Sequence, residues 1–520
     1  MILLGFDYGT TNSMVAQYRV DGRSDIEILD RRSSSIQDGQ AFIRSPKRLM
    51  SMTPLDETRA GGYLRCFLSP ILEQMNMSFP KGERVMLTVT VPNAFKDVQC
   101  KLMLDTVRNT CKEVFSAAQF QDENVAILPE PVAAALFYVY QNAVADQDKT
   151  GLVTICDIGG GTTDLAIVRY VVEGEPGRRS IRFKVVCTDG CDKLGGDDID
   201  EIIADDLIAR YDLDERSYSP KTLLAACQAL KRILSVQQSA TVALTGPDGK
   251  QPARDAQGKI IQLSLTRFRL NKLLEQFFAP KLTAIFSSLK KELATRLGMD
   301  DPAEVDRFLE LKSTLLPIGG TSQIPYLRTI MKAHLRGDLF LLPGETADSE
   351  GHAPFDSVVR GAAVYSGWRN GSLKGIKDII IEERTLHRIS IRDVDDNLIT
   401  IVERNMLSLQ PHKPKEELFP RFMDPDGKTF RIHRIDLYEG EGDFVGDTSY
   451  GPPPVHLQSL ADQLESIDDP IYVHDRALAD IPIEIQLFIN EFGRLQAMEL
   501  CVPGGQEDHS DYKKTFKFIQ

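Results

Sequence analysis

The run VTICDIGGGTTDLAIVRY, residues 153–170, decides the fold of this chain. Two apolar segments, Val153–Ile155 and Leu165–Val168, alternate at the period of a β-strand and flank a glycine-rich turn, which predicts a β-hairpin. Three successive glycines allow a turn to bring its backbone N–H groups close to an anion. Asp157 and Asp164 flank this turn, and carboxylates suit a phosphate site only if a divalent cation such as Mg²⁺ lies between the charges. The alternative is a glycine-rich hairpin with a solvated acidic rim.

The N-terminus repeats this pattern. Residues 1–17, MILLGFDYGTTNSMVAQ, contain an apolar strand, an aspartate (Asp7), a glycine, paired hydroxyl residues and a second apolar run, in the same order. A duplicated Asp-Gly-Thr hairpin is far more specific than a single glycine-rich turn. We therefore predict that the two hairpins face each other and hold a polyphosphate from both sides.

The size and charge of the chain limit the classes of protein to which it can belong. With 520 residues it can hold several domains of about 150 residues each. A net charge of −14 argues against nucleic acid or an anionic membrane as a partner. The eight cysteines contain no CxxC pair and the histidines show no ligand spacing, so free thiols are expected rather than a zinc site. No apolar run approaches about 18 residues and no basic flank marks a signal peptide, so we expect a cytoplasmic protein without a membrane partner.

Further elements follow the first hairpin. Val85–Pro92 predicts a buried strand, and Asp97–Phe115 has the apolar spacing of a helix. NVAILPEPVAAAL, residues 124–136, predicts a strand that runs into a helix, with Glu130 held between two prolines. The last part of the chain alternates apolar and polar residues between Gly, Pro and Asp, which predicts a β-sandwich.

Several motifs occur in a fixed order along the chain. They are GFDYGTTNSMVA (5–16), KRL (47–49), VTVPNAFKDVQ (89–99), ILPEPVAAAL (127–136), CDIGGGTTDLAIV (156–168), FKVVCTDGCDKLGGDDID (183–200), ACQALKRILSVQQS (226–239), LPIGGTSQIP (316–325) and DSVVRGAAV (356–364). In this order they resemble the DnaK-type seventy-kilodalton heat-shock chaperones, which belong to the superfamily of actin, sugar kinases and chaperone ATPases.

The resemblance implies a fold and a domain order. Residues 1–372 are expected to form a two-lobed, actin-like α/β ATPase domain built of duplicated ribonuclease-H-like cores. Residues 373–383 resemble the interdomain linker, although the run KGIKDIIIEE within them is also typical of an ordinary edge strand. Residues 384–520 are expected to form a β-sandwich that binds peptides, with no helical lid after Gln520.

The resemblance also implies which residues act on the nucleotide. Lys47 resembles the family's catalytic lysine, while Glu130, Asp157 and Thr162 would orient the attacking water. Asp7 and Asp157 would hold Mg²⁺ largely through its waters, and K⁺ is a further candidate ion. The residues implied to contact ATP or ADP are Gly9, Thr10, Thr11, Asn12, Gly159, Gly160, Gly161, Thr162, Thr163, Gly195, Gly196, Asp197, Gln228, Lys231, Arg232, Ser235, Gly319, Gly320, Thr321, Gln323 and Asp356.

Polypeptide clients are the implied partners of the sandwich. A groove between its loops would hold an extended peptide by main-chain hydrogen bonds, with Ile391 and Val394 as candidate pocket residues. The loop DVDDNL, residues 393–398, is acidic where the family has small or apolar residues, which favours basic clients. Without a lid, a captured peptide would exchange quickly.

Three positions depart from the family pattern. Ala126 stands where the family has a basic residue that docks J-domain co-chaperones, and Cys100 where it has an arginine linked to a proline switch. Gln323 replaces an arginine that stacks on adenine, which would weaken ATP binding. The change at Ala126 argues against J-domain docking, while co-chaperones in general remain candidate partners.

We predict a slow, Mg²⁺-dependent ATP hydrolase that resembles a chaperone and couples its nucleotide state to the binding of extended or unfolded polypeptide. The main alternative is an ATP-dependent switch that binds one dedicated protein partner with little turnover. A sugar-kinase-like phosphotransferase or an actin-like filament protein is disfavoured, because neither accounts for the linker and the sandwich.

Overall fold

The computed structural model covers most of the chain up to residue 382 and separate strands beyond it. It describes residues 1–382 except 10–11, 21–24, 35, 39–40, 44–45, 52–54, 81, 93–94, 96, 143–148, 176, 192, 300, 342–354 and 374. It then describes 389–392, 398–402, 429–430, 437–439, 443–445, 448–450, 455–456, 471–472, 484–489, 495–502, 506 and 509–517. The first compact unit comprises Met1–Pro92, Thr106–Ile181 and Val185–Ile379, and the second Asn93–Asp105, Arg182–Lys184 and Ile380–Gln520. Among the described helices, none combines the length and apolarity needed to cross a membrane.

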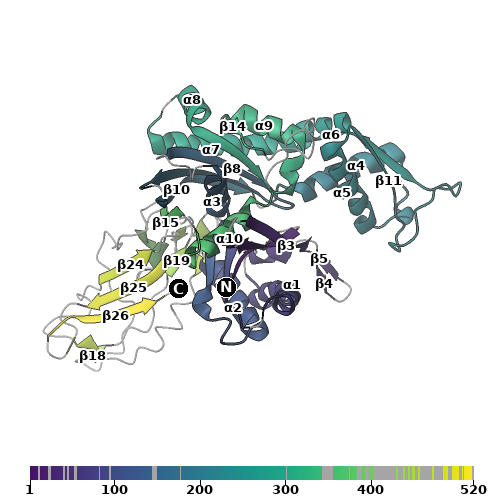
Figure 1. Ribbon diagram of the computed structural model, residues 1–520. Helices are drawn as coiled ribbons and strands as arrows, with labels where there is room; N and C mark the ends of the chain where they lie inside the picture. The colour runs from purple at the N-terminus through teal and green to yellow at the C-terminus, as the bar shows by residue number, and fades with distance from the viewer. Residues whose placement is uncertain are drawn as a thin grey trace. The chain divides into compact units, whose positions relative to one another are not determined.

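The first unit contains a five-stranded sheet in the order β3-β2-β1-β6-β7 (Figure 1). The strands β1 and β2 are antiparallel, with Asp7 opposite Met14, which confirms the predicted N-terminal hairpin. The strands β6 and β7 continue the sheet in parallel with β1. The bounds are β1 Ile2–Asp7, β2 Asn12–Arg19, β3 Asp25–Ser33, β6 Val85–Val91 and β7 Val125–Pro129.

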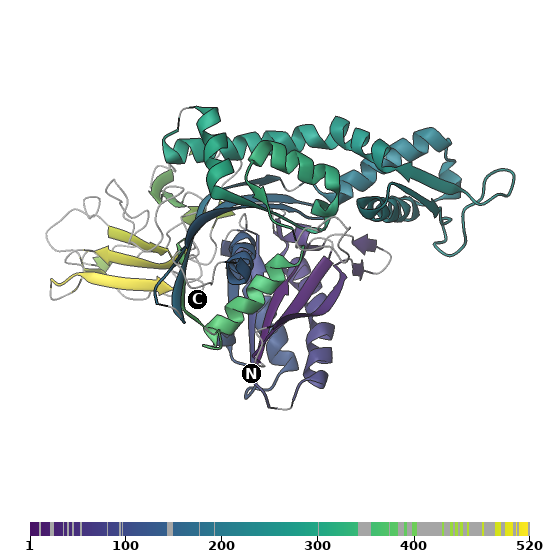
Figure 2. The ribbon, with the colours of Figure 1, turned by 45° about the horizontal axis from the view of Figure 1, so that its top comes forward.

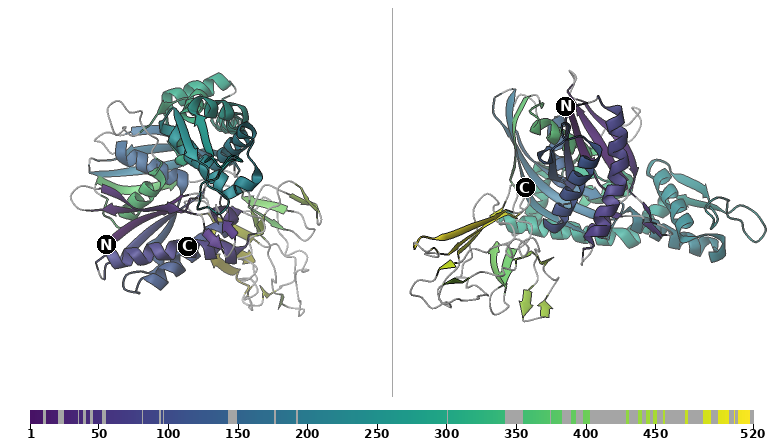
Figure 3. Two further views of the ribbon diagram at one scale, coloured as in Figure 1. Left: turned by 90° about the vertical axis from the view of Figure 1, so that its right-hand side faces the viewer. Right: turned by 90° about the horizontal axis from the view of Figure 1, so that it is seen from below.

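Two helices cover opposite faces of this sheet, because successive side chains of a strand point to opposite sides. The ring of Phe6 on β1 lies 6.4 Å from the ring of Phe67 on α1 (Glu57–Ser78). The neighbouring residue on β1 is Gly5, where a Cβ atom would lie 2.5 Å from the backbone of α10 (Ser357–Arg369). The purple helix beside the purple strands in Figure 3 is α1.

The helix α10 also packs against α3 (Glu130–Asn142) at backbone distance. A Cβ atom on Gly361 would lie only 1.8 Å from the carbonyl oxygen of Ala133, so a residue with a side chain cannot occupy this crossing without movement of the helices. Because Glu130 begins α3, this crossing helps to fix the position of its carboxylate.

A second, six-stranded sheet, most of whose residues belong to the first unit, has the order β14-β13-β8-β9-β10-β15. Its hairpin β8–β9 is antiparallel and closes with Ile158 opposite Thr163, so the predicted glycine-turn hairpin is confirmed, with longer strands than the sequence indicated. Residues 375–382 of the run KGIKDIIIEE form the edge strand β15. The bounds are β8 Lys149–Ile158, β9 Thr163–Glu173, β10 Arg178–Cys191, β13 Ser313–Ile318, β14 Asp338–Leu339 and β15 Gly375–Glu382.

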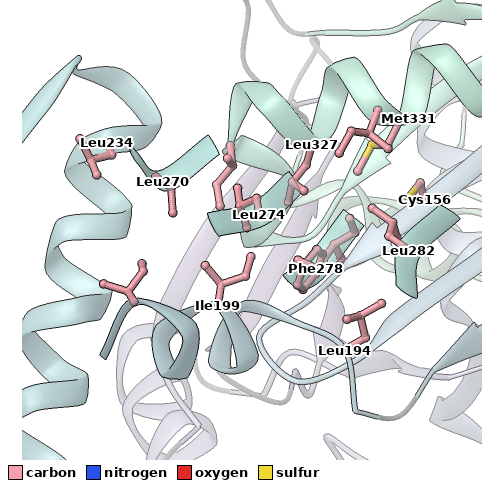
Figure 4. Packing of buried hydrophobic residues seen from close by; sticks show 14 of the residues in the cluster. Cys156, Leu194, Ile199, Leu234, Leu270, Leu274, Phe278, Leu282, Leu327 and Met331 are labelled. Atoms are coloured by element: carbon pink, nitrogen blue, oxygen red, sulfur yellow. The ribbon is translucent and has the colours of Figure 1, made fainter. Parts of the chain in front are cut away.

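The largest apolar core lies between this second sheet and its helices. Figure 4 shows Cys156 of β8 together with Leu282 of α7 and Leu327 of α9, all fully buried. In Figure 2 the teal helices lie over the long strands of the sheet, while α3 contacts β8 and β9. The remaining helices are α2 Asp97–Val114, α4 Gly196–Tyr211, α5 Pro220–Val236, α6 Arg267–Leu273, α7 Ala279–Leu297, α8 Pro302–Lys312 and α9 Pro325–Leu335.

The helix α5 ends within the motif ACQALKRILSVQQS, which covers residues 226–239. Its N-cap Ser219 accepts a hydrogen bond from the N–H of Thr222, and the helix stops at Val236 because Gln237 has an extended backbone. Ser239 then begins β11 (Ser239–Ala243), which pairs with β12 (Gln262–Thr266).

The described strands of the second unit are antiparallel, as the alternating sequence predicts. One sheet has the order β17-β16-β19-β22 and another the order β24-β25-β26. On β24 and β25 the alternate residues Ile485, Leu487, Met498 and Leu500 are buried. The packing of these sheets into a sandwich, and the domain boundaries, stay predictions. The bounds are β16 Ile389–Arg392, β17 Leu398–Val402, β19 Leu437–Glu439, β22 Val455–His456, β24 Glu484–Ile489, β25 Leu495–Val502 and β26 Tyr512–Lys517.

We expect Gly361→Ala to destabilise the first unit by about 1–3 kcal/mol, because the new methyl group overpacks the α10–α3 crossing. The matched control is Gly62→Ala in α1, where a Cβ atom would meet nothing within 4 Å. That change should be neutral or stabilise the helix by about 0.5–1 kcal/mol. Chemical unfolding of the two variants checks the prediction, and equal effects would contradict it.

Candidate functional site

A cleft of about 950 Å³ in the first unit gathers most of the residues that the sequence singled out. Residues of both hairpins line it, together with residues of η1, α3, α4, α5 and η5. The predicted residues that it brings together are Asp7, Gly9, Asn12, Lys47, Glu130, Asp157, Gly159, Gly160, Thr162, Gly196, Asp197, Gln228, Lys231, Arg232, Ser235, Gly319, Gly320, Thr321 and Gln323.

A buried ion pair lies at one part of this cleft. Lys47 follows the first residue of the 3₁₀ helix η1 (Pro46–Ser51), and its Nζ is 2.6 Å from Oε1 of Glu130, the first residue of α3. Both side chains are at most one-tenth exposed. Nearby, Asp7 at the end of β1 accepts a hydrogen bond from the hydroxyl of Thr90 at 3.1 Å.

The carboxylates around this pair outnumber the lysine, and their pKa values reflect it. Burial raises the pKa of Asp7 to about 6, with a further increase from Glu130. Burial also raises the pKa of Asp157 well above its ordinary value, and Glu130, Asp164 and Asp7 add to the effect. Burial alone would lower the pKa of Lys47, but Glu130 and Asp7 outweigh it, so that this pKa is raised and the ammonium stays charged.

These side chains fit a magnesium ion. Among the described residues no group of three or more His, Cys, Asp or Glu side chains could hold a metal by itself. Mg²⁺ keeps several waters and uses one or two carboxylates together with phosphate oxygens. Asp7 and Asp157, two partly buried carboxylates with raised pKa values, provide a donor set of this kind.

The glycine turn of the second hairpin is fastened to the start of α4. The N–H of Gly196 donates to the carbonyl of Gly159 at 3.0 Å, and the N–H of Asp197 donates to the carbonyl of Gly160 at 2.6 Å. The hydroxyl of Thr321 in η5 also donates to the carbonyl of Gly159, at 2.8 Å. Two elements that are far apart in sequence, α4 and η5, therefore hold the turn in a single conformation.

Gly319, which precedes η5 (Gly320–Gln323), has to be glycine for two reasons. Its φ of 78° is disfavoured for residues with a side chain, and a Cβ atom would lie 2.3 Å from Oδ1 of Asp157. This close approach places the start of η5 directly beside the carboxylate of the second hairpin.

Ser34, the residue after β3, holds the turn of the first hairpin. The hydroxyl of Ser34 donates to the carbonyl of Gly9 at 2.7 Å and lies 2.7 Å from the hydroxyl of Ser13. Thr10 and Thr11, the predicted donors to the phosphates, lie outside the described residues.

Lys231 on α5 has a structural role in addition to its place on the cleft wall. Its Nζ lies 2.7 Å from Oδ1 of the fully buried Asp200 and donates to the carbonyl of Gly196. The ammonium group thus connects α5 to the N-terminus of α4, at the point where that helix holds the glycine turn.

Four predicted residues do not line the cleft: Gly161, Thr163, Gly195 and Asp356. Thr163 is fully buried and its hydroxyl donates to the carbonyl of Leu194 at 2.7 Å. Asp356 pairs with Arg360 at 2.7 Å, and its buried Oδ1 has no hydrogen-bond partner among the described residues. Gly195 lies behind the glycine turn, because a Cβ atom there would lie 2.7 Å from the carbonyl oxygen of Gly160.

The predicted peptide-contacting residues belong to the second unit. Ile391 lies on β16, where the strand registers place it opposite Ile399 and Leu437. Val394 lies outside the described residues. Their contact with peptides stays a prediction.

The sequence-based prediction of site residues omitted twelve of the described residues that line the cleft, among them Asp164, Arg31 and Phe355. Asp164, directly after the glycine turn, was noted as a flanking carboxylate, and the symmetry of the turn was the signal that could have placed it in the site. Arg31 and Phe355 also line the cleft, but neither belongs to a motif that would have indicated it.

The architecture defines a class before any comparison is made. Two sheets, each with an Asp-Gly hairpin that reaches a common cleft, make a mixed α/β structure that is consistent with the actin-like ATPase fold. The family model described as Hsp70 protein matches residues 77–441, well over half of the chain. The chain therefore belongs to the Hsp70 family, whose members are ATPases that bind ATP or ADP with Mg²⁺ and bind polypeptide clients. The resemblance to the DnaK-type chaperones is thereby confirmed.

The raised pKa of Asp7 predicts how pH affects stability without metal or nucleotide. The pKa of Asp7 is about 6 in the folded protein, against an ordinary value of 3.8. Protonation of Asp7 therefore favours the folded state. This contribution to the free energy of unfolding is complete below pH 3.8 and is lost as pH rises through 6. The loss amounts to about 3 kcal/mol at pH 7.

We therefore expect Asp7→Asn to unfold at a higher temperature than the unmodified protein at pH 7, with a difference that shrinks toward pH 4. Asp205→Asn, on the exposed side of α4, is the control and should change little. Equal unfolding temperatures of the Asp7 variant and the unmodified protein at pH 7 would contradict the assignment of a strained carboxylate.

Proposed function

We propose that the chain binds ATP with Mg²⁺ in this cleft, hydrolyses it slowly and couples its nucleotide state to the binding of extended polypeptide. The observation that carries the proposal is the convergence of two Asp-Gly hairpins on a cleft that also contains the buried Lys47–Glu130 pair. A volume of about 950 Å³ suits a nucleotide.

Phosphoryl transfer to water depends on positioning and on neutralising charge. Lys47 keeps its proton because of its carboxylate neighbours, so it can donate to an oxygen of the terminal phosphate. Glu130 holds that ammonium in place and, with Asp157 and Thr162, orients the attacking water. Bound Mg²⁺ would supply Lewis-acid charge to the phosphate oxygens, with Asp7 and Asp157 holding it.

The nucleoside lies, in this proposal, against α5 and η5. Gln228 and Lys231 would contact the ribose, and Arg232 and Ser235 the adenine, since all four line the cleft. Gly319 and Gly320 leave the wall of the cleft without side chains, so that a ring can approach the backbone.

Polypeptide binding is assigned to the second unit. Its antiparallel strands, with one apolar face buried, are suited to hold an extended peptide by main-chain hydrogen bonds. Ile391 and Val394 are the proposed pocket residues. A peptide array probed with and without ATP tests client binding and its control by nucleotide together.

The predicted linker, residues 373–383, contains β15 and would connect ATP hydrolysis to polypeptide binding. This strand is the edge of the sheet that carries the glycine turn, and the carbonyl of Lys377 accepts a hydrogen bond from Nε1 of Trp368 at 3.2 Å. Trp368 is the single tryptophan of the chain, so its fluorescence reports on this contact.

We expect Lys47→Ala to lower the rate of ATP hydrolysis by about 10²–10³-fold, because the terminal phosphate loses a charged donor. Binding of ATP should be largely kept. Asp157→Asn should behave in the same way. Phosphate release and a binding titration measure the two properties.

Lys112→Ala is a matched control, because its ion pair with Asp122 is exposed and lies outside the cleft. Hydrolysis by this variant should equal that of the unmodified protein. Tight ATP binding by the unmodified protein without turnover would instead favour the switch that serves one dedicated partner.

We expect ATP to protect β15. Acrylamide quenching of Trp368 should fall when ATP is added, and proteolysis near Ile379–Ile381 should slow. Because proteolysis follows the population of the open form, a preference of 1.4 kcal/mol for the docked strand slows cleavage about tenfold. Trp368→Phe controls for the origin of the signal, and an unchanged cleavage rate would argue against coupling.

A further inference from the structure

Arg31 is a cleft residue that the proposed chemistry does not use. It lies on β3 of the first sheet, and its guanidinium carbon is 4.5 Å from the centre of the Phe355 ring. Both residues line the cleft. Its neighbour Arg32 is paired with Asp30, so that carboxylate is already engaged.

Arg232 lies across the cleft on α5, and it is close enough to affect Arg31. Burial lowers the pKa of Arg31, the positive charge of Arg232 lowers it further, and Asp356 raises it. Within the described residues the Arg232 guanidinium makes neither a hydrogen bond nor an ion pair. Arginines from two different parts of the fold, β3 and α5, therefore bring positive charge to the same cleft.

The surroundings of Arg31 suit a flat ring better than a phosphate. A guanidinium is planar and stacks on aromatic faces. One face of Arg31 is taken by Phe355, which leaves the other face for a ligand. The groups that suit a metal-bound phosphate tail are the carboxylates and the glycine turn, and Asp157 is one of these carboxylates. Gly319 lies beside Asp157, and the cleft wall continues from there to Gln323.

We propose that Arg31 is a base-stacking residue, which packs on the nucleobase of the bound nucleotide while Arg232 contacts the base from the other side. This role of Arg31 rests on the proposed binding of ATP in the cleft. Gln323 also lines the cleft, but its side chain is an uncharged amide. Arg31 therefore supplies a second guanidinium to the base, from β3.

The test compares a ligand with a base and one without. Isothermal titration with Mg²⁺ is carried out with ATP and with inorganic tripolyphosphate on the full-length chain. Arg31→Ala should weaken ATP binding about tenfold, as loss of a stacked cation predicts, and leave tripolyphosphate binding unchanged. Arg19→Ala on β2, which removes an exposed pair with Glu27, should change neither.

Arg31→Lys separates stacking from charge. It keeps the positive charge but lacks the planar group, so it should bind ATP as weakly as Arg31→Ala. Full rescue by lysine, equal loss of ATP and tripolyphosphate binding, or unchanged ATP binding in Arg31→Ala would each overturn the inference alone. Absence of ATP binding by the unmodified protein would overturn the proposed function as well. Thermal unfolding of each variant confirms that it is folded.

Discussion

The glycine turn between β8 and β9 depends on hydrogen bonds that it accepts from other parts of the chain. The carbonyl of Gly159 accepts from Gly196 and Thr321, and the carbonyl of Gly160 accepts from Asp197. In a planar trans peptide the carbonyl and the next N–H point in opposite directions. The N–H of Gly160 therefore points away from Gly196 and Thr321. Without these contacts three glycines would sample many conformations, so the cost of ordering the turn is met by folding rather than by the ligand.

The cleft is also defined by a charge imbalance that the fold maintains. Asp7, Glu130 and Asp157 surround Lys47. Burial raises the pKa values of both aspartates, the neighbouring carboxylates raise them further, and the single ammonium only partly offsets this. A site of this kind is destabilising until a cation arrives, which is a common property of functional sites. Elsewhere on the cleft wall Arg232 has no ionic partner among the described residues, which suits a ligand with an anionic tail and an electron-rich ring.

The parts that the sequence predicted are those whose signal is local. Both hairpins follow from strand alternation and glycine turns within about twenty residues, and the strand-to-helix junction at Glu130 follows from its flanking prolines. Contacts between distant segments gave no such signal. The pair Lys231–Asp200, the crossing at Gly361 and the place of Arg31 in the cleft depend on the tertiary structure, and an arginine on a strand has no motif that distinguishes it from a solvated one.

The strand β15, which consists of residues of the predicted linker, is also the edge strand of the six-stranded sheet. The strand order β8-β9-β10-β15 places the edge strand two ladders from the glycine-turn hairpin. Ser180 of β10 donates a side-chain hydrogen bond to Asp378 of β15 at 3.2 Å, and Trp368 of α10 donates to Lys377. The same helix packs on Gly5 of the first sheet, so the edge strand contacts both β10 of its own sheet and the helix that covers the first sheet. Under the proposed coupling, a nucleotide that brought the two hairpins together would act on β15 through these two side-chain hydrogen bonds, one from β10 and one from α10.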